Sequence, residues 1–196
     1  MLVIGLTGNI GTGKTTVSGI LAQLGAATID ADKLGHELLQ PGSQAYQEVV
    51  AAFGESILNR NREIDRHKLG QLVFNDPAAL ARLNQMMHPK MYEITRETIE
   101  QCRKQGVKVA VVEVILLIEA GWTSLVDQVW VTVAPEAVIV ERIKAERGLD
   151  EAQILARLRS QMPSKEKMKH ADVVIDTDCP LAELKAKVSE LWQNLP

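Results

Sequence analysis

The chain has 196 residues, a length that suits one domain with inserted segments. Hydrophobic residues make up 46% and charged residues 24%, which indicates a globular protein rather than a disordered or disulfide-stabilised chain. The 22 Lys and Arg residues against 25 Asp and Glu residues give a formal net charge of −3. Because proteins that bind nucleic acid through bulk electrostatics need positive charge, we expect no nucleic-acid partner.

The sequence also bears on the compartment in which the protein works. Its first residues contain no basic segment followed by a long apolar run, so we expect no export signal. The longest apolar stretch, 109–118, is interrupted by Glu113 and is shorter than the roughly 18 residues that span a bilayer, so we expect no membrane partner. Cys102 and Cys179 belong to no metal-ligand or redox motif and are interpreted as reduced thiols of a cytoplasmic protein.

The beginning of the chain predicts a strand, a glycine-rich loop and a helix. Residues 2–7 form a short, branched apolar run that is typical of a strand buried on both faces. From Lys14 the apolar residues recur at helical spacing until Gly25, a common helix terminator. A second short strand is predicted at 27–29.

The middle and the end of the chain alternate between helical and strand patterns. Residues 33–106 show short helical patterns, with one helix expected to start at His88-Pro89 because proline suits the first turn. Further strands are predicted at 107–118, 129–133 and 172–175. Helices are predicted from Pro135, through a basic stretch at 142–169, and at 181–192.

Strands that alternate with helices predict an α/β fold with a mostly parallel sheet of about five strands flanked by helices. We expect a core made of 1–32, 107–142 and 168–196, a helical insertion at 33–106 and a basic helical segment at 143–167. Open sheets of this kind bind ligands at the carboxyl ends of their strands. Glu113 interrupts a predicted core strand, and its carboxylate faces either that crevice or an exposed side of the strand.

The loop after the first predicted strand matches the pattern G-x-x-x-x-G-K-[ST] in full. Glycines let main-chain N–H groups point at phosphate oxygens, and the helix N-terminus adds partial positive charge. The ammonium of Lys14 would reach the β- and γ-phosphates as a catalytic group, and the hydroxyl of Thr15 would ligate Mg²⁺. We therefore predict an ATP site formed by Gly8, Asn9, Ile10, Gly11, Thr12, Gly13, Lys14, Thr15 and Thr16.

Two carboxylates follow the second predicted strand, Asp30 and Asp32. A carboxylate at this edge of the sheet could accept the proton of an attacking hydroxyl. Either residue could instead cap the helix that starts near Lys33. The base is the favoured interpretation for Asp32, and the cap is the favoured one for Asp30.

The basic stretch holds Arg142, Arg147 and Arg157, and Arg157 shares a helical face with Gln161. A solvated basic face is one interpretation. The other is a mobile lid whose arginines meet the negative charge of a transferring phosphoryl group, with Arg142 as a catalytic residue.

Taken together, the residues resemble those of the dephospho-coenzyme A kinases, a family of the P-loop group related to nucleoside monophosphate kinases. The resemblance spans nearly the whole chain and includes the phosphate loop, Ile29-Asp30-Ala31-Asp32, His88-Pro89, Leu116-Leu117-Ile118-Glu119 with Gly121-Trp122, and the stretch from Arg142 to Gln161.

The resemblance implies transfer of the ATP γ-phosphate to the ribose 3′-hydroxyl of dephospho-coenzyme A, which completes coenzyme A synthesis. It implies that Asp32 is the base, that 33–106 covers the acceptor and that 143–167 is the lid. It further implies acceptor contacts from Asp32, His88, Leu116 and Glu119, and ATP contacts from Arg147, Arg157 and Thr177.

The sequence departs from the family pattern at three positions, with His36 in place of Arg, Ile115 in place of Pro and Thr177 in place of Asn. Two rival interpretations are a P-loop kinase of another small molecule and a nucleotide-dependent switch protein. We expect a monomer or a weak homo-oligomer.

Overall fold

The computed structural model describes residues 1–196 apart from the side chain of Arg147. The chain divides into two compact units. The first comprises Met1–Asp30 and Arg96–Pro196, and the second comprises Ala31–Thr95.

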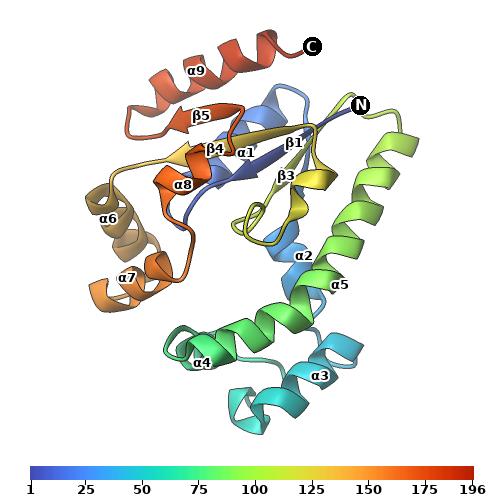
Figure 1. Cartoon of the computed structure of the whole chain (residues 1–196), viewed down its shortest axis with the longest axis vertical. Coiled ribbons are helices and arrows are strands. Elements are labelled where there is room, and N and C mark those ends of the chain that lie inside the picture. Colours follow the sequence, from blue (N-terminus) through green and yellow to red (C-terminus); the bar gives the residue numbers. More distant parts are fainter. The chain divides into compact units, whose positions relative to one another are not determined.

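The first unit is built on a parallel sheet (Figure 1). In the described part of the chain it has five strands in the order β2-β3-β1-β4-β5. The strands are β1 (Leu2–Thr7), β2 (Ala27–Asp30), β3 (Val109–Glu113), β4 (Gln128–Val133) and β5 (Val173–Asp176). The predicted fold class is therefore confirmed.

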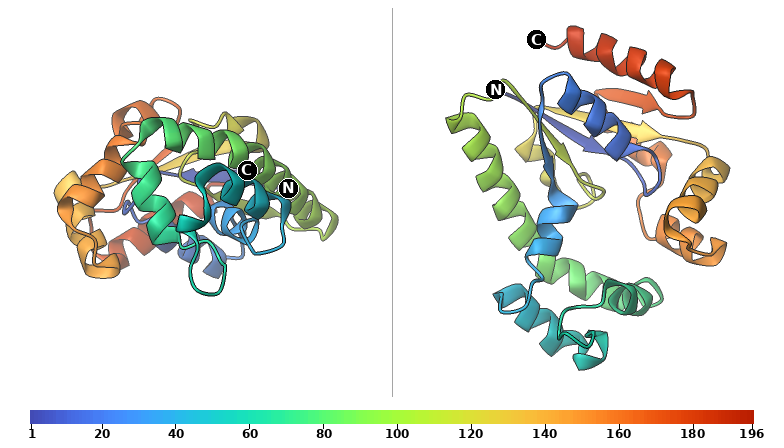
Figure 2. Two further views of the ribbon diagram at one scale, coloured as in Figure 1. Left: turned by 90° about the horizontal axis from the view of Figure 1, so that it is seen from below. Right: turned by 180° about the vertical axis from the view of Figure 1, so that it is seen from behind.

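Helices flank the sheet on both faces. They are α1 (Lys14–Gln23), α6 (Glu136–Arg147), α7 (Glu151–Arg159), α8 (Ser164–Met168) and α9 (Leu181–Gln193), with a 3-10 turn, η2 (Trp122–Leu125). The views from opposite sides show α1 on one face of the sheet and α8 on the other (Figure 2). Helices α6 and α7 lie together beyond the carboxyl end of β4.

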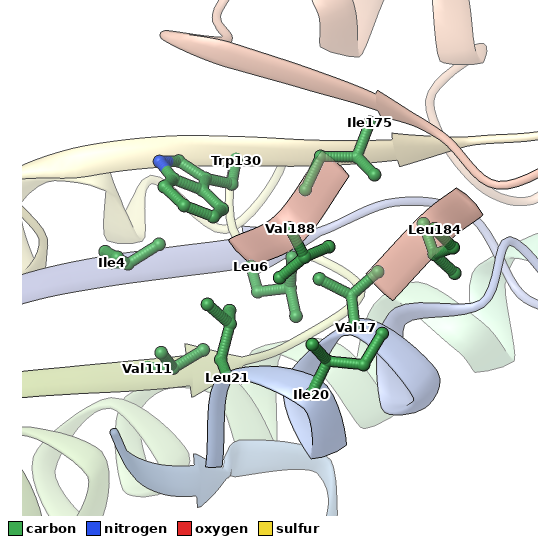
Figure 3. Packing of buried hydrophobic residues seen from close by; sticks show 10 residues of the cluster. All are labelled: Ile4, Leu6, Val17, Ile20, Leu21, Val111, Trp130, Ile175, Leu184 and Val188. Atoms are coloured by element: carbon green, nitrogen blue, oxygen red, sulfur yellow. The ribbon is translucent and has the colours of Figure 1, made fainter. Parts of the chain in front are cut away.

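The main core fills the space between the sheet, α1 and α9 (Figure 3). Leu6 and Trp130, from adjacent strands, pack against Leu21 of α1 and Val188 of α9. All four are at least 99% buried. Burial of each such side chain contributes about 1.5–3 kcal/mol, so this cluster supplies much of the unit's stability.

Strand register decides which polar side chains reach the face of α1. Leu6 of β1 pairs with Glu113 of β3, and Ile4 pairs with Val111 two positions earlier. Because alternate residues of a strand share a face, Glu113 points to the same side as the buried Val111. The alternative left open for Glu113 is thereby decided, since its carboxylate lies on the α1 side at the carboxyl end of the sheet.

The second unit is helical and has its own small core. Its elements are α2 (Ala31–Glu37), α3 (Gln44–Phe53), the 3-10 turn η1 (Glu55–Ile57), α4 (Arg66–Phe74) and the first part of α5 (Pro77–Lys104). Val49 of α3, Ile57 of η1, Val73 of α4 and Met87 of α5 are buried together. The side chain of Asp65 caps α4 by accepting from the amides of two following residues.

Two predictions about local structure are wrong. A helix does not start at His88-Pro89, because Pro89 lies inside the 28-residue α5. Proline removes a single main-chain hydrogen bond, and the packing of Met87 and Met91 on either side offsets that loss. The predicted strand 107–118 covers only Val109–Glu113, and of the apolar residues after it Val114 and Leu117 are buried outside the sheet.

Carboxylates that precede two strands bond to the main chain of the neighbouring strand. Asp127, which precedes β4, accepts the amide of Val3 at 2.7 Å, and Asp172, which precedes β5, accepts the amide of Val129 at 2.7 Å. Each aspartate also donates its own amide to the carbonyl of the same residue. The two carboxylates therefore extend the ladder by one bond at each strand start.

We expect Asp127→Ala to lower the free energy of unfolding by about 1.5–3 kcal/mol, since it removes a hydrogen bond to a charged group. Asp127→Asn keeps an acceptor and should cost less. Urea unfolding followed by circular dichroism measures both. Equal stability of Asp127→Ala and wild type would show that the carboxylate does not stabilise the start of β1.

Candidate active site

The loop between β1 and α1 has the backbone shape of a phosphate cradle. Gly8 has φ 148° and Gly11 has φ 75°, values that side chains other than glycine rarely adopt. A Cβ on Gly8 would lie 2.5 Å from the carbonyl oxygen of Thr132, so the loop also needs glycine for space. The loop leads directly into α1 at Lys14, whose N-terminal amides and dipole favour an anion.

Lys14 is folded into this loop. Its side chain is buried, and Nζ donates to the carbonyls of Gly8 at 3.0 Å and Asn9 at 3.1 Å. The ammonium is thus fixed among main-chain atoms of the loop, at the position where a phosphate would meet it.

Threonine hydroxyls from β4 and from the residue after β5 bond to the loop residue Thr12. Thr132 lies within hydrogen-bond distance of the Thr12 hydroxyl at 2.7 Å, and Thr12 donates to the carbonyl of Asn9. The Thr177 hydroxyl lies 3.0 Å from the Thr12 carbonyl. These three side chains are buried, so the loop rests on a dry, hydrogen-bonded floor.

Thr177 also orients Arg142 of α6. The guanidinium donates from Nη1 to the Thr177 hydroxyl at 3.0 Å and from Nη2 to the Thr177 carbonyl at 2.8 Å. Two bonds to one residue fix the plane of the guanidinium. The threonine that replaces the family's usual Asn therefore joins a predicted catalytic arginine to the base of the phosphate loop.

A hydroxyl and a carboxylate meet at the start of α1. Thr15 donates to Oε1 of Glu113 at 2.7 Å, and Glu113 is 92% buried. Asp30 of β2 pairs in register with Glu113 at the neighbouring strand end. Among the described residues no group of three or more His, Cys, Asp or Glu side chains could hold a metal by itself. An oxygen pair of this kind suits Mg²⁺, which takes few protein ligands and keeps waters or phosphate oxygens.

The basic segment packs on the phosphate loop through an apolar cluster. The side chain of Ile10 is buried among Ile139 and Ile143 of α6 and Ile154 of α7. The main-chain N–H of Ile10 donates to Oε1 of Gln161 at 3.0 Å. The segment is therefore joined to the loop by both apolar and polar contacts.

The end of the basic segment is anchored by an ion pair between a buried lysine and a solvent-accessible glutamate. Lys167 is fully buried, and its Nζ lies 2.9 Å from Oε1 of Glu119 and donates to the carbonyl of Ile115 at 2.6 Å. Glu119 also accepts the amide of Met162 at 3.0 Å. The turn after β3 and the segment that enters α8 are thereby tied together.

The first unit brings together the predicted loop residues, Arg142, Thr177 and Glu119. Arg157 is half-buried on α7, and Leu116 lies in the turn after β3. Thr16 is exposed on α1. The predicted contact from Arg147 falls on a side chain outside the described part of the structure.

Two predicted site residues lie in the second unit. Asp32 is the second residue of α2, and Asp30 directly precedes that helix. Asp30 thus has the position of an N-cap, whereas Asp32 lies inside the first turn. His88 lies in the middle of α5.

Sequence reasoning missed three contacts of the site. The bond between Glu113 and Thr15 depends on strand register. The sequence shows Glu113 as an unexpected carboxylate in an apolar run, but it does not show the partner of that carboxylate. The bond from Ile10 to Gln161 spans 151 positions, and the pairing of Lys167 with Glu119 spans 48. In the sequence Lys167 is one of several lysines in a basic stretch, and nothing nearby indicates that it is buried.

The parallel sheet, the glycine loop with its inward lysine and the adjoining basic helices define a P-loop kinase, an enzyme that transfers a phosphoryl group. The family model described as dephospho-CoA kinase matches residues 2–183. The chain belongs to the dephospho-CoA kinase family, as its sequence pattern predicted.

Individual relatives support this over nearly the whole length. A dephospho-CoA kinase of Geobacter sulfurreducens is 44% identical over 98% of this chain and 98% of its own. A solved protein of Thermus thermophilus has a TM-score of 0.79 at 30% identity, covering 100% of this chain and 98% of its own. The solved dephospho-CoA kinase of Campylobacter jejuni has a TM-score of 0.70 at 29% identity, covering 97% and 95%. These findings favour the kinase over the switch protein.

In the described residues, none of the helices is both long and apolar enough to cross a membrane.

We expect Lys167→Met to lower the free energy of unfolding by about 1–3 kcal/mol, because it leaves the carbonyl of Ile115 and the carboxylate of Glu119 without the buried ammonium. Lys169→Met is the matched control, since Lys169 pairs with Glu166 on the surface and its loss should cost less than about 1 kcal/mol. Chemical denaturation measures both. Similar losses in the two variants would contradict the anchoring role of Lys167.

Proposed function

We propose that this protein transfers the γ-phosphoryl group of ATP to the ribose 3′-hydroxyl of dephospho-coenzyme A, the last step of coenzyme A synthesis. The observation that carries the proposal is the match to the dephospho-CoA kinase family across residues 2–183. The phosphate loop supplies a site of the right chemistry for the donor.

The triphosphate binds in the loop. Main-chain N–H groups of the loop donate to the phosphate oxygens, apart from those of Ile10 and Thr12, which are bonded within the protein. The ammonium of Lys14 lies where it can exchange its carbonyl partners for the β- and γ-phosphates. Arg142, held by Thr177, adds a second cation near the loop. Cations fixed before the reaction stabilise the charge of the transferring phosphoryl group without reorganisation.

Thr15 and Glu113 form the proposed magnesium site. The threonine hydroxyl would ligate the ion directly, and the carboxylate would hold one of its waters or ligate it in turn. Bound Mg²⁺ neutralises charge on the β- and γ-phosphate oxygens. Glu113 also fixes the rotamer of Thr15, so the hydroxyl is oriented before the ion arrives.

The acceptor is proposed to meet Asp32, His88, Leu116 and Glu119. Asp32, in the first turn of α2, takes the proton of the attacking hydroxyl. Glu119 is already bonded to Lys167, so its contribution comes from fixing the turn that carries Leu116.

The stretch 143–167 is proposed to cover the nucleotide as a lid, with Arg147 and Arg157 contacting phosphates and Thr177 near the adenine. Residues 33–106 are proposed to cover the acceptor. A cytoplasmic location, a monomeric or weakly associated state and the absence of nucleic-acid and membrane partners stay predictions.

The proposal is tested by measuring ADP formation with a panel of acceptors in a coupled assay. We expect fast turnover with dephospho-coenzyme A and little with shikimate, nucleosides or nucleoside monophosphates. A higher kcat/KM for any of the other acceptors would assign the protein to another substrate. A Lys14→Met variant, which loses the ammonium, controls for contaminating kinases.

We expect Glu113→Gln to raise the Mg²⁺ concentration needed for half-maximal activity by about 10-fold or more, because the amide keeps an acceptor for Thr15 but loses the charge. Asp30→Asn, at the adjacent strand end, is the control and should leave this concentration within about twofold. Titration of Mg²⁺ at saturating ATP and acceptor measures the effect. An unchanged midpoint in Glu113→Gln would remove this carboxylate from the metal site.

We expect Asp32→Asn to lower kcat by about 100-fold or more while the KM for ATP changes little, because an amide cannot accept the hydroxyl proton. Steady-state kinetics against both substrates measure the two parameters. If Asp32 only stabilises its helix, Asp32→Ala would cost about 1 kcal/mol of stability and keep its activity at low temperature. Such retained activity would contradict the base.

A further inference from the structure

Gln161 lies just beyond α7, and its side chain is bonded to the main chain of the phosphate loop. It follows Ser160, which ends α7, and its Oε1 accepts the N–H of Ile10 at 3.0 Å. The loop and this glutamine are 151 positions apart, so the contact exists only through the fold.

The peptide whose N–H donates this hydrogen bond has little conformational freedom. The Ile10 side chain is buried against Ile139, Ile143 and Ile154. The following residue, Gly11, has φ 75°, and a Cβ there would lie 2.9 Å from atoms of Ile139 and Ile143. The bend of the loop is therefore held from one side by the apolar cluster and from the other by Gln161.

Gln161 itself is presented by an anchored stretch of chain. The next residue, Met162, donates its amide to Glu119, which pairs with the buried Lys167. The main chain that carries Gln161 is therefore held in place, and this fixes where its carboxamide contacts the loop. This arrangement differs from that of a surface side chain that meets a main-chain amide by chance.

We propose that Gln161 is a positioning residue for the nucleotide phosphates, acting through the Ile10 peptide. Its Oε1 takes the N–H at the bend, so the peptide keeps its orientation and the later amides of the loop stay aimed into the cradle. Without this acceptor the N–H is unsatisfied beside an apolar cluster, and rotation of the peptide would relieve it.

The proposal extends to how the basic segment acts on the loop. Because Gln161 lies where that segment returns to the sheet, its hydrogen bond adds a polar link between the segment and the loop to the apolar contacts of Ile10. The inference rests on the proposed nucleotide site and is independent of the identity of the acceptor, so ADP alone is a sufficient probe.

The experiment compares Gln161→Met, which keeps the length but loses the acceptor, with Gln161→Glu, which keeps it. Gln153→Met is the matched control, since Gln153 lies in the same segment and its Oε1 accepts from Asp150 within the cap of α7. Calorimetric titration gives the dissociation constant for ADP, and hydrogen exchange by NMR reports the Ile10 amide. Gln161→Asn, which is one methylene too short, serves as a second variant.

We expect Gln161→Met and Gln161→Asn to weaken ADP binding about 5- to 20-fold and to speed exchange of the Ile10 amide. Their KM for ATP should rise more than kcat falls, because no reacting group is removed. Gln161→Glu and Gln153→Met should stay within about threefold of wild type.

Wild-type ADP binding in both Gln161→Met and Gln161→Asn would overturn the proposal. Weaker binding in Gln161→Glu than in Gln161→Met would also overturn it, because Oε1 would then lie against the phosphates and repel them as a carboxylate. Wild-type ADP binding by Lys14→Met would instead refute the proposed nucleotide site, a result that does not depend on Gln161.

Discussion

Main-chain N–H groups of a loop can donate together to a phosphate only when other groups hold the loop in shape. In this protein the holding groups come from strand β4, from helices α6 and α7 and from the residues after them. Thr132 and Thr177 bond to the loop, Ile10 is buried in the apolar cluster, and Gln161 takes one amide at the bend. The cost of ordering the loop is thus met at folding, before any nucleotide binds.

The charges of the site follow from the same arrangement. Lys14 is buried among carbonyls and Arg142 is oriented by Thr177, so two cations lie on the loop side. The nearest described carboxylate to Thr15 is that of Glu113, at the end of the neighbouring strand. The proposed triphosphate with a divalent ion would complement both, since its oxygens would meet the cations and its ion would meet the carboxylate.

Local patterns were enough to predict the fold class and the phosphate loop. The strand-loop-helix unit at the start has a sharp sequence signature, because glycine, lysine and threonine are each needed at one position. Two local predictions failed for a shared reason. Pro89 lies inside α5, and the residues after Glu113 leave the sheet, because tertiary packing of Met87 and Leu117 decides these segments rather than local propensity.

The rest of the site lay beyond the sequence because it depends on contacts between distant segments. A lone glutamate in an apolar run does not reveal its register, and Gln161 has no local feature that connects it to Ile10. The same holds for Lys167, because the sequence does not distinguish a buried lysine from a solvated one. The pairing with Glu119 is seen only in the folded structure. Packing and register, rather than composition, supply this information.

The proposed function depends on which hydroxyl of the acceptor carries the new phosphate. The most direct measurement is phosphorus NMR of the product formed from ATP and dephospho-coenzyme A by the full-length protein. If the proposed function is right, a phosphomonoester forms at the ribose 3′ position in an amount equal to that of ADP, and this product does not form with the Lys14→Met variant. Release of free phosphate at the same rate with and without dephospho-coenzyme A, and no new phosphomonoester, would contradict it.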